Sequence, residues 1–160
     1  MATTLKVKIT EDIILDNQDY SSKRVLEVGS ITSIVKRVVN IGTDEFGLLG
    51  FGAAYNTELS KSYLAGQFDE DLVRYIRITN LDTTNHIALV LKNENNDEFG
   101  VKVDKGCSFL YCADLAGGVK DTMDSADAAG ITPNSFGDLV DITCAADTAA
   151  CDVEVFVASA

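Results

Sequence analysis

The sequence predicts an all-β protein: one antiparallel β-sandwich domain, jelly-roll-like, over residues 1–160. Val, Ile and Thr are abundant and there is a single Pro, a composition typical of strands. Ten or eleven short strand-like segments are separated by turn residues, and no segment reads convincingly as a long helix. The number of strands and two long excursions, at 51–71 and 113–137, favour a jelly roll over a smaller immunoglobulin-type sandwich.

The first strand is predicted where Leu5, Val7 and Ile9 alternate with polar residues, which is the period of a half-buried strand. A short second run at 13–15 ends at turn-forming residues 17–19.

Two more strands are predicted at 24–28 and 31–41, with Gly29 and Ser30 between them. The second segment also carries apolar residues at helical spacing, so a helix is the alternative there. We favour a strand because the segment is rich in Val and Ile and follows a glycine break.

Residues 46–56 are punctuated by glycine, and the stretch up to 71 is expected to be a long loop or a short helix. The clearest part of the chain then follows, where four strand-like runs are joined by turn-rich links of hairpin length. Short links leave no room for a parallel crossover, so we expect an antiparallel meander of 72–80, 86–93, 98–104 and 107–112.

The segment 113–137 is rich in Ala, Gly, Asp and Ser and is predicted to be a long loop. Two last strands are expected at 138–144 and 152–158. The final strand alternates, so one face should carry Val153, Val155 and Val157, and the other Glu154, Phe156 and Ala158.

The charge is acidic and uneven along the chain. The formal net charge is −12, which opposes binding to nucleic acid or to an anionic membrane. Residues 1–40 carry six basic and five acidic side chains, whereas no Lys or Arg follows Lys120 and eight acidic residues do. We therefore expect 1–40 to be a docking region near a partner, and the last forty residues to lie nearer the solvent.

No apolar run approaches the length of a membrane span, and the amino-terminal MATTLKVKIT has no hydrophobic signal core. We therefore expect the protein to be made and used without crossing a membrane as a precursor.

Catalytic chemistry has little support. His86 is the only histidine, so a triad would have to use it as the general base, and no G-x-S-x-G accompanies it. A solvated or hydrogen-bonded strand-edge histidine is the favoured interpretation. Zinc catalysis based on histidine is not expected either, since it needs more than one His or a tight Cys cluster.

The four cysteines form no C-x-x-C pair, so neither a zinc ribbon nor a thioredoxin-like site is indicated. Cys107 and Cys112 are five apart, hence on opposite faces of one strand. Cys144 and Cys151 flank the link between the last two strands, and a disulfide between them could close that hairpin. Reduced thiols are the expectation for a protein made inside a cell.

Carboxylates gather in three places. The sets at 69–71 and 94–98 fall in a loop and a hairpin turn, and Asp121, Asp124 and Asp127 could ligate Ca²⁺ but lack the order of an EF-hand. Solvated charge is favoured at all three. We expect no enzyme activity, no cofactor and no metal.

One stretch resembles a known kind of protein. The residues VRYIRITNLDTTNHIALVLKNENNDEFGVKVDKGCSFLY (73–111), followed by GDLVDITC and DVEVFVASA within 137–160, resemble small structural proteins of marine tailed bacteriophages, especially cyanophage-like ones. Such proteins are head decoration or cement components or other accessory parts of the particle. The resemblance implies assembly in the host cytoplasm, a final place on the capsid surface, and the major capsid protein or other virion proteins as partners.

The leading hypothesis is thus a non-enzymatic capsid decoration protein, as a homo-oligomer for which a trimer would suit three-fold shell positions. A tail or head–tail component is the alternative. From another class comes a carbohydrate-binding module for host glycans, which the 8% aromatic content and the lack of Trp disfavour. A hydrolase based on His86 ranks last.

Overall fold

The computed structural model of the chain describes residues 3–52, 63–112, 119–121 and 137–160. These residues form strands and connections and contain no helix, hence none that could cross a membrane. The all-β prediction is confirmed.

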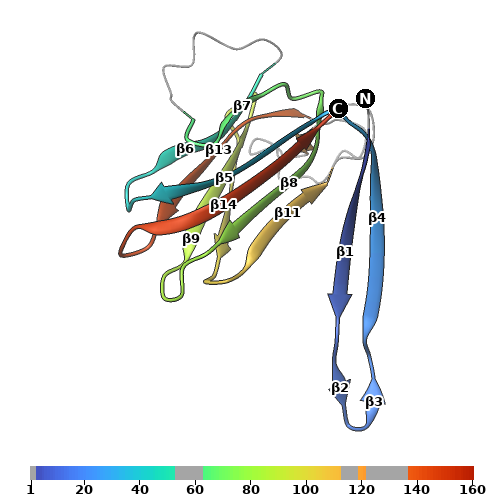
Figure 1. The fold of residues 1–160 in the computed structure, drawn as a ribbon. Coiled ribbons are helices and arrows are strands. Elements are labelled where there is room, and N and C mark those ends of the chain that lie inside the picture. Colours follow the sequence, from blue (N-terminus) through green and yellow to red (C-terminus); the bar gives the residue numbers. More distant parts are fainter. Residues whose placement is uncertain (1–2, 53–62, 113–118, 122–136) are drawn as a thin grey trace, which may run out of the picture.

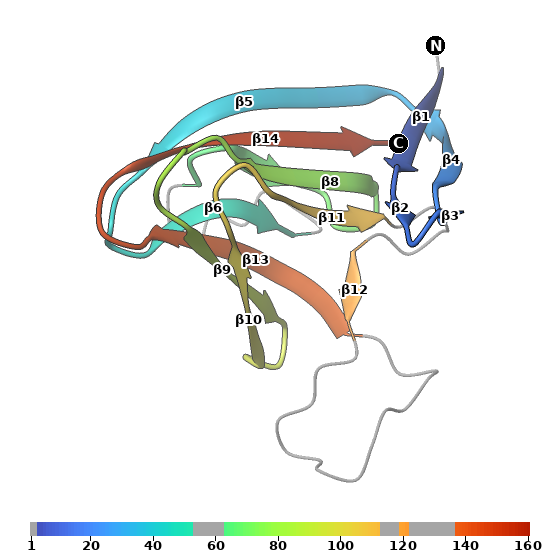
Figure 2. The same cartoon turned by 90° about the horizontal axis from the view of Figure 1, so that it is seen from below.

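Two sheets pack face to face and are seen as separate layers in Figure 2. The first sheet has the order β11 (Ser108–Cys112), β8 (Val73–Asn80), β14 (Cys151–Ser159) and β5 (Ser33–Ile41). The second has the order β10 (Glu98–Val103), β9 (Ile87–Asn93), β13 (Gly137–Ala146), β6 (Phe46–Phe51) and β7 (Gly66–Phe68), with β12 (Lys120–Asp121) also paired to β13. Every pairing is antiparallel except that of β6 with β7.

The connectivity is that of a jelly roll, as predicted. Leaving aside the short β7 and β12, the strands after residue 32 divide four and four between the sheets, and the chain changes sheet at each connection except the β9–β10 hairpin. Such alternation puts the first and last of these strands, β5 and β14, side by side.

The expected meander at 72–112 is wrong, although its four strands are present. Strand β8 pairs with β11 in one sheet, whereas β9 pairs with β10 in the other. The link predicted at 81–85, which the observed strands extend to 81–86, is short enough for a hairpin, and this shortness is why the sequence predicts one. Six residues can extend about 20 Å, however, which is ample to cross the roughly 10 Å between two packed sheets.

Residues 33–41 form strand β5, as favoured over a helix, whereas Ile31 ends β4, so the break between the two strands lies at Thr32 and not at the predicted Gly29 and Ser30. Val39 and Ile41 face the core, whereas Ile34 and Val38 lie on the opposite face and are 53% and 57% exposed. The apolar residues at helical spacing thus belong to two faces of one strand.

The core lies between the sheets. On β14 the predicted alternation holds, because Val153, Val155 and Val157 are buried in the core while Glu154 and Phe156 face outward. Facing them are apolar side chains of the second sheet, among them Leu49, Ile87, Leu89 and Ile142.

The amino-terminal part forms a long hairpin that projects from the sandwich (Figure 1). We call it the arm: β1 (Thr3–Glu11) pairs with β4 (Ser22–Ile31), and the short β2 (Ile14–Leu15) and β3 (Gln18–Asp19) follow at its end. Asp16 and Asn17 make the turn with positive φ angles of 50° and 62°. Two such residues suit a type I′ turn, which matches the twist of a hairpin, and Asp and Asn tolerate this conformation well.

The root of the arm is packed against the first sheet. Val28 and Ile31 of β4 form a small buried cluster with Tyr75 and Ala158, and Leu5 and Val7 cover it. Further out, the same face of the hairpin carries Ile9 and Leu26, 46% and 38% exposed. The apolar face of the arm therefore extends beyond the sandwich on which it begins to pack.

Candidate interaction surface

His86 lies in the connection before β9, beside Asp147 of the connection after β13. Its Nδ1 is 3.3 Å from Asp147 Oδ2, and the Asp147 backbone N–H donates to the His86 carbonyl at 3.1 Å. Asp147 is its one ion-pair partner in the described part of the chain. The two side chains join two connections of the sandwich, so His86 has a carboxylate partner beside the start of β9.

The carboxylate sets at 69–71 and 94–98 stabilise turns. Asp69 Oδ1 accepts from the Asp71 N–H at 3.1 Å, and Glu98 pairs with Lys92 across the β9–β10 hairpin. Asp124 and Asp127 lie outside the described residues. The residues that the structure describes contain no group of three or more His, Cys, Asp or Glu arranged to hold a metal ion.

All four cysteines are free thiols in the structure. Cys144 on β13 and Cys151 on β14 are buried, and because β13 and β14 belong to different sheets, the link between them is a crossing and not the hairpin expected. Burial, and to a lesser extent Cys151, raises the pKa of Cys144 to about 12. Cys107 and Cys112 are exposed.

We expect two thiols, Cys107 and Cys112, to react with iodoacetamide in the native protein at pH 8, because a buried thiol with a raised pKa offers almost no thiolate. In denaturant without reductant, mass spectrometry should count four alkylated thiols. A count of two there, rising to four after reduction, would instead establish the Cys144–Cys151 disulfide. The Cys107→Ser/Cys112→Ser variant is the control, with a native count of zero.

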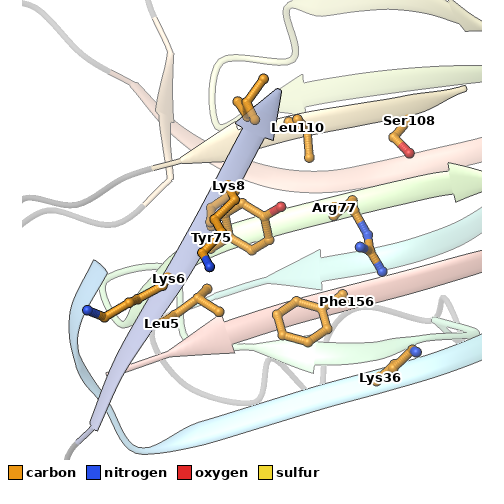
Figure 3. A pocket seen from close by; sticks show the side chains of 11 residues that line it. Leu5, Lys6, Lys8, Lys36, Tyr75, Arg77, Ser108, Leu110 and Phe156 are labelled. Carbon is orange, nitrogen blue, oxygen red and sulfur yellow. The ribbon is translucent and has the colours of Figure 1, made fainter. Parts of the chain in front are cut away.

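A groove lies at the root of the arm and has a volume of about 480 Å³. Figure 3 shows side chains that line it. It lies between β1 and the outer face of the first sheet. Pairing across the sheet places one side chain of each strand in a row that runs over its floor: Lys36, Phe156, Arg77 and Leu110. Residues 5–9 of β1 form the wall, and Tyr75 and Ser108 complete the lining.

The groove is basic although the protein is acidic. Four cations line it: Lys6, Lys8, Lys36 and Arg77. Lys6 pairs with Glu27 at 2.7 Å across the arm, and Lys36 and Arg77 share Glu154, with Lys36 Nζ 3.0 Å from Glu154 Oε2. Lys8 has no carboxylate partner among the residues described. Its positive charge is therefore available to a ligand.

Aromatic rings make the apolar part of the floor. The Arg77 guanidinium lies over Phe156, 5.7 Å from the ring centroid, and Tyr75 meets Phe156 edge to face at 5.9 Å. Leu110 of β11, an edge strand of the first sheet, is 45% exposed. The groove can therefore receive an apolar group flanked by negative charge.

Replacing Glu154 by Gln should destabilise the protein by about 1–2 kcal/mol at pH 7, because hydrogen bonds to a charged group are lost. Its pKa lies below the usual value, chiefly through the hydrogen bond from Lys36. The stabilisation is thus complete above the unfolded-state pKa near 4.5 and is lost as the pH falls through the lower folded-state pKa. Urea unfolding at pH 7 and pH 3 should show a difference between variant and wild type that shrinks in acid. An equal difference at both would contradict this role.

The expected separation of charge along the chain needs correction. Of the last forty residues the structure describes 121 and 137–160, where β13 and β14 lie within the two sheets and supply much of the core, so this described part forms no separate acidic side. Within the near-neutral residues 1–40, the charges are divided between two parts. The end of the arm, 11–20, has four carboxylates and no Lys or Arg, whereas the strands that flank it have six basic residues and one acidic residue.

The arm lies within residues 1–40, which were predicted as a docking region, but neither its projection from the sandwich nor the groove was predicted. The alternation of Leu5, Val7 and Ile9 signalled a half-buried strand, and the lysines between them were visible. Their meeting with Arg77 and Phe156 depends on the packing of the arm on the first sheet and on the pairing of β8 with β14, whose partners are at least 73 residues apart in sequence. The sequence carries no local signal for either.

Comparison with known proteins found no family model, no curated protein and no solved structure that matches this chain.

Proposed function

We propose that this protein is a non-enzymatic virion structural protein, a capsid decoration or cement protein that binds the outside of a phage head. It is assembled in the host cytoplasm and acts as a homo-oligomer on the capsid surface. The observation that carries the proposal is the amount of apolar surface that residues 1–40 leave in water. Large exposed apolar surfaces mark sites of protein–protein contact.

This surface has two parts. One is the arm, on which Val25 is 58% exposed and Ile14 is 75% exposed. The other is the outer face of β5, with Ile34 and Val38. We assign the β5 face, continuous with the arm through Thr32, as the contact with the major capsid protein.

The resemblance of 73–111 and 137–160 to structural proteins of marine tailed phages supports the proposal from the sequence. The jelly roll is compatible with it, but a fold by itself does not specify a function.

Electron cryomicroscopy of purified particles tests the location. We expect density that fits the sandwich at repeated positions on the outside of the head. Location in the tail or at the head–tail junction would replace the proposal with its alternative, and absence from the particle would reject both.

A binding assay tests the contact surface. The Ile34→Asp/Val38→Asp variant should bind heads that lack the protein at least about tenfold more weakly, since two charges would enter an apolar contact. The control is Phe99→Asp, which changes an equally exposed apolar residue on β10, in the other sheet. Equal binding of both variants would contradict the assignment of β5.

A further inference from the structure

The end of the arm is built to contact another molecule. Residues 11–20, which we call the tip, expose Ile13, Ile14, Leu15 and Tyr20 by 52%, 75%, 57% and 59%. The same ten residues carry four carboxylates, Glu11, Asp12, Asp16 and Asp19, and no cation. The tip is therefore apolar and negatively charged at once.

Hydrogen bonds hold the tip in one conformation. The Tyr20 N–H donates to the Ile13 carbonyl at 3.0 Å, and the Ile13 N–H donates to Ser21 Oγ at 3.2 Å. Asp19 Oδ1 accepts from the Ser21 N–H at 2.8 Å, and hydrogen bonds from the Ser21 side chain and then from its backbone lower the pKa of Asp19. A preformed tip loses little conformational entropy on binding.

The groove at the root of the arm has the complementary chemistry. Its floor offers Phe156 and Leu110 to apolar side chains, and Lys8, Lys36 and Arg77 surround them with positive charge (Figure 3). The arm runs away from this groove (Figure 1), and the twelve residues from Leu5 to Asp16 span about 36 Å when extended. A tip therefore cannot enter the groove of its own chain.

We propose that the tip of one copy binds in the groove of a second copy. Apolar tip residues would cover Phe156 and Leu110, and tip carboxylates would lie near Lys8 and the neighbouring cations. Each chain carries one tip and one groove, so the contact can close reciprocally in a dimer or head to tail in a ring. This contact between copies adjoins the proposed contact with the shell, because Lys36 of the groove lies between Ile34 and Val38 on the same face of β5, but it needs no particle to form.

Sedimentation velocity on the purified full-length chain tests the inference. At about 100 µM the wild type should sediment as an oligomer. The tip variant Ile14→Ser/Leu15→Ser and the groove variant Lys8→Glu/Leu110→Ser should each be monomeric. An equimolar mixture of the two should form a heterodimer, because one partner retains an intact groove and the other an intact tip.

Phe99→Ser is the matched control, since it removes an equally exposed apolar side chain from β10 and should leave the oligomer intact. Unchanged circular dichroism spectra and melting temperatures would show that the variants fold, as expected for exposed positions. A monomeric wild type, an oligomer that survives either double variant, or a mixture without heterodimer would each overturn the inference. Binding to heads is measured separately, so the two proposals can fail independently.

Discussion

Replacing Asn80 by Leu should lower the free energy of unfolding by about 3 kcal/mol and the melting temperature by about 6–12 °C. Asn80 is fully buried at the end of β8. Its Nδ2 donates to the carbonyls of Asn85 and Val103, at 2.9 and 3.2 Å, and its Oδ1 accepts from the Asp82 N–H at 3.0 Å. A leucine has a similar branched shape but no hydrogen-bonding atoms, so it would leave these three backbone groups without their partner.

The effect should be large because Asn80 joins two of the connections by which the chain changes sheet. Its side chain binds the link after β8, and its own backbone bonds to Gly106 and Cys107 in the link after β10. Both links are short, and without Asn80 some of their buried backbone N–H and C=O groups would lack hydrogen-bond partners.

Urea and thermal unfolding of Asn80→Leu measure the cost, with Asn95→Ala as the control. Asn95 is exposed, and the bond it contributes to the β9–β10 turn comes from its backbone N–H, which alanine keeps. The control should stay within about 0.5 kcal/mol of wild type. A cost below that value for Asn80→Leu would show that water can replace the side chain there.

The meander prediction failed because the sheet that a strand joins is not a local property of its sequence. Alternation and turn residues located the strands because both are local properties. Which sheet a strand joins depends on its long-range partners, and a link of six residues fits a hairpin and a crossing equally well. Asn80 ends one such crossing, but an asparagine at a strand end is also common in hairpins.

The arm shows a similar limit. Leu5, Val7 and Ile9 have one pattern and were predicted to be equally half-buried. The structure covers the first two and exposes Ile9, because the sandwich ends beneath the hairpin. Local sequence thus predicted that one face of the arm is apolar. That this face extends beyond the sandwich, and so forms the candidate surface, follows only from the tertiary arrangement.

Replacing Gly50 by Ala should lower the free energy of unfolding by about 3 kcal/mol, although alanine is normally more favourable in a strand than glycine. The ring of Tyr63 lies directly over Gly50, and an added Cβ would be 2.5 Å from its Cε2. The ring would have to move, and overpacking of this kind lowers stability by about 1–3 kcal/mol. Its hydroxyl also donates to buried Asp141, the cross-strand partner of Gly50, at 3.3 Å, and displacement weakens that bond too.

A double-mutant cycle separates this clash from any backbone requirement for glycine. Tyr63→Ala removes the ring and should itself cost about 3–5 kcal/mol. In that background Gly50→Ala should cost nothing or stabilise by up to about 1 kcal/mol, because alanine restricts the unfolded chain more than glycine does. Gly100→Ala on β10 is the matched control, since a Cβ there meets no atom within 4 Å and should have the same small effect in both backgrounds. If Gly50→Ala costs as much without the ring as with it, the glycine is required by the backbone of β6 and not by Tyr63.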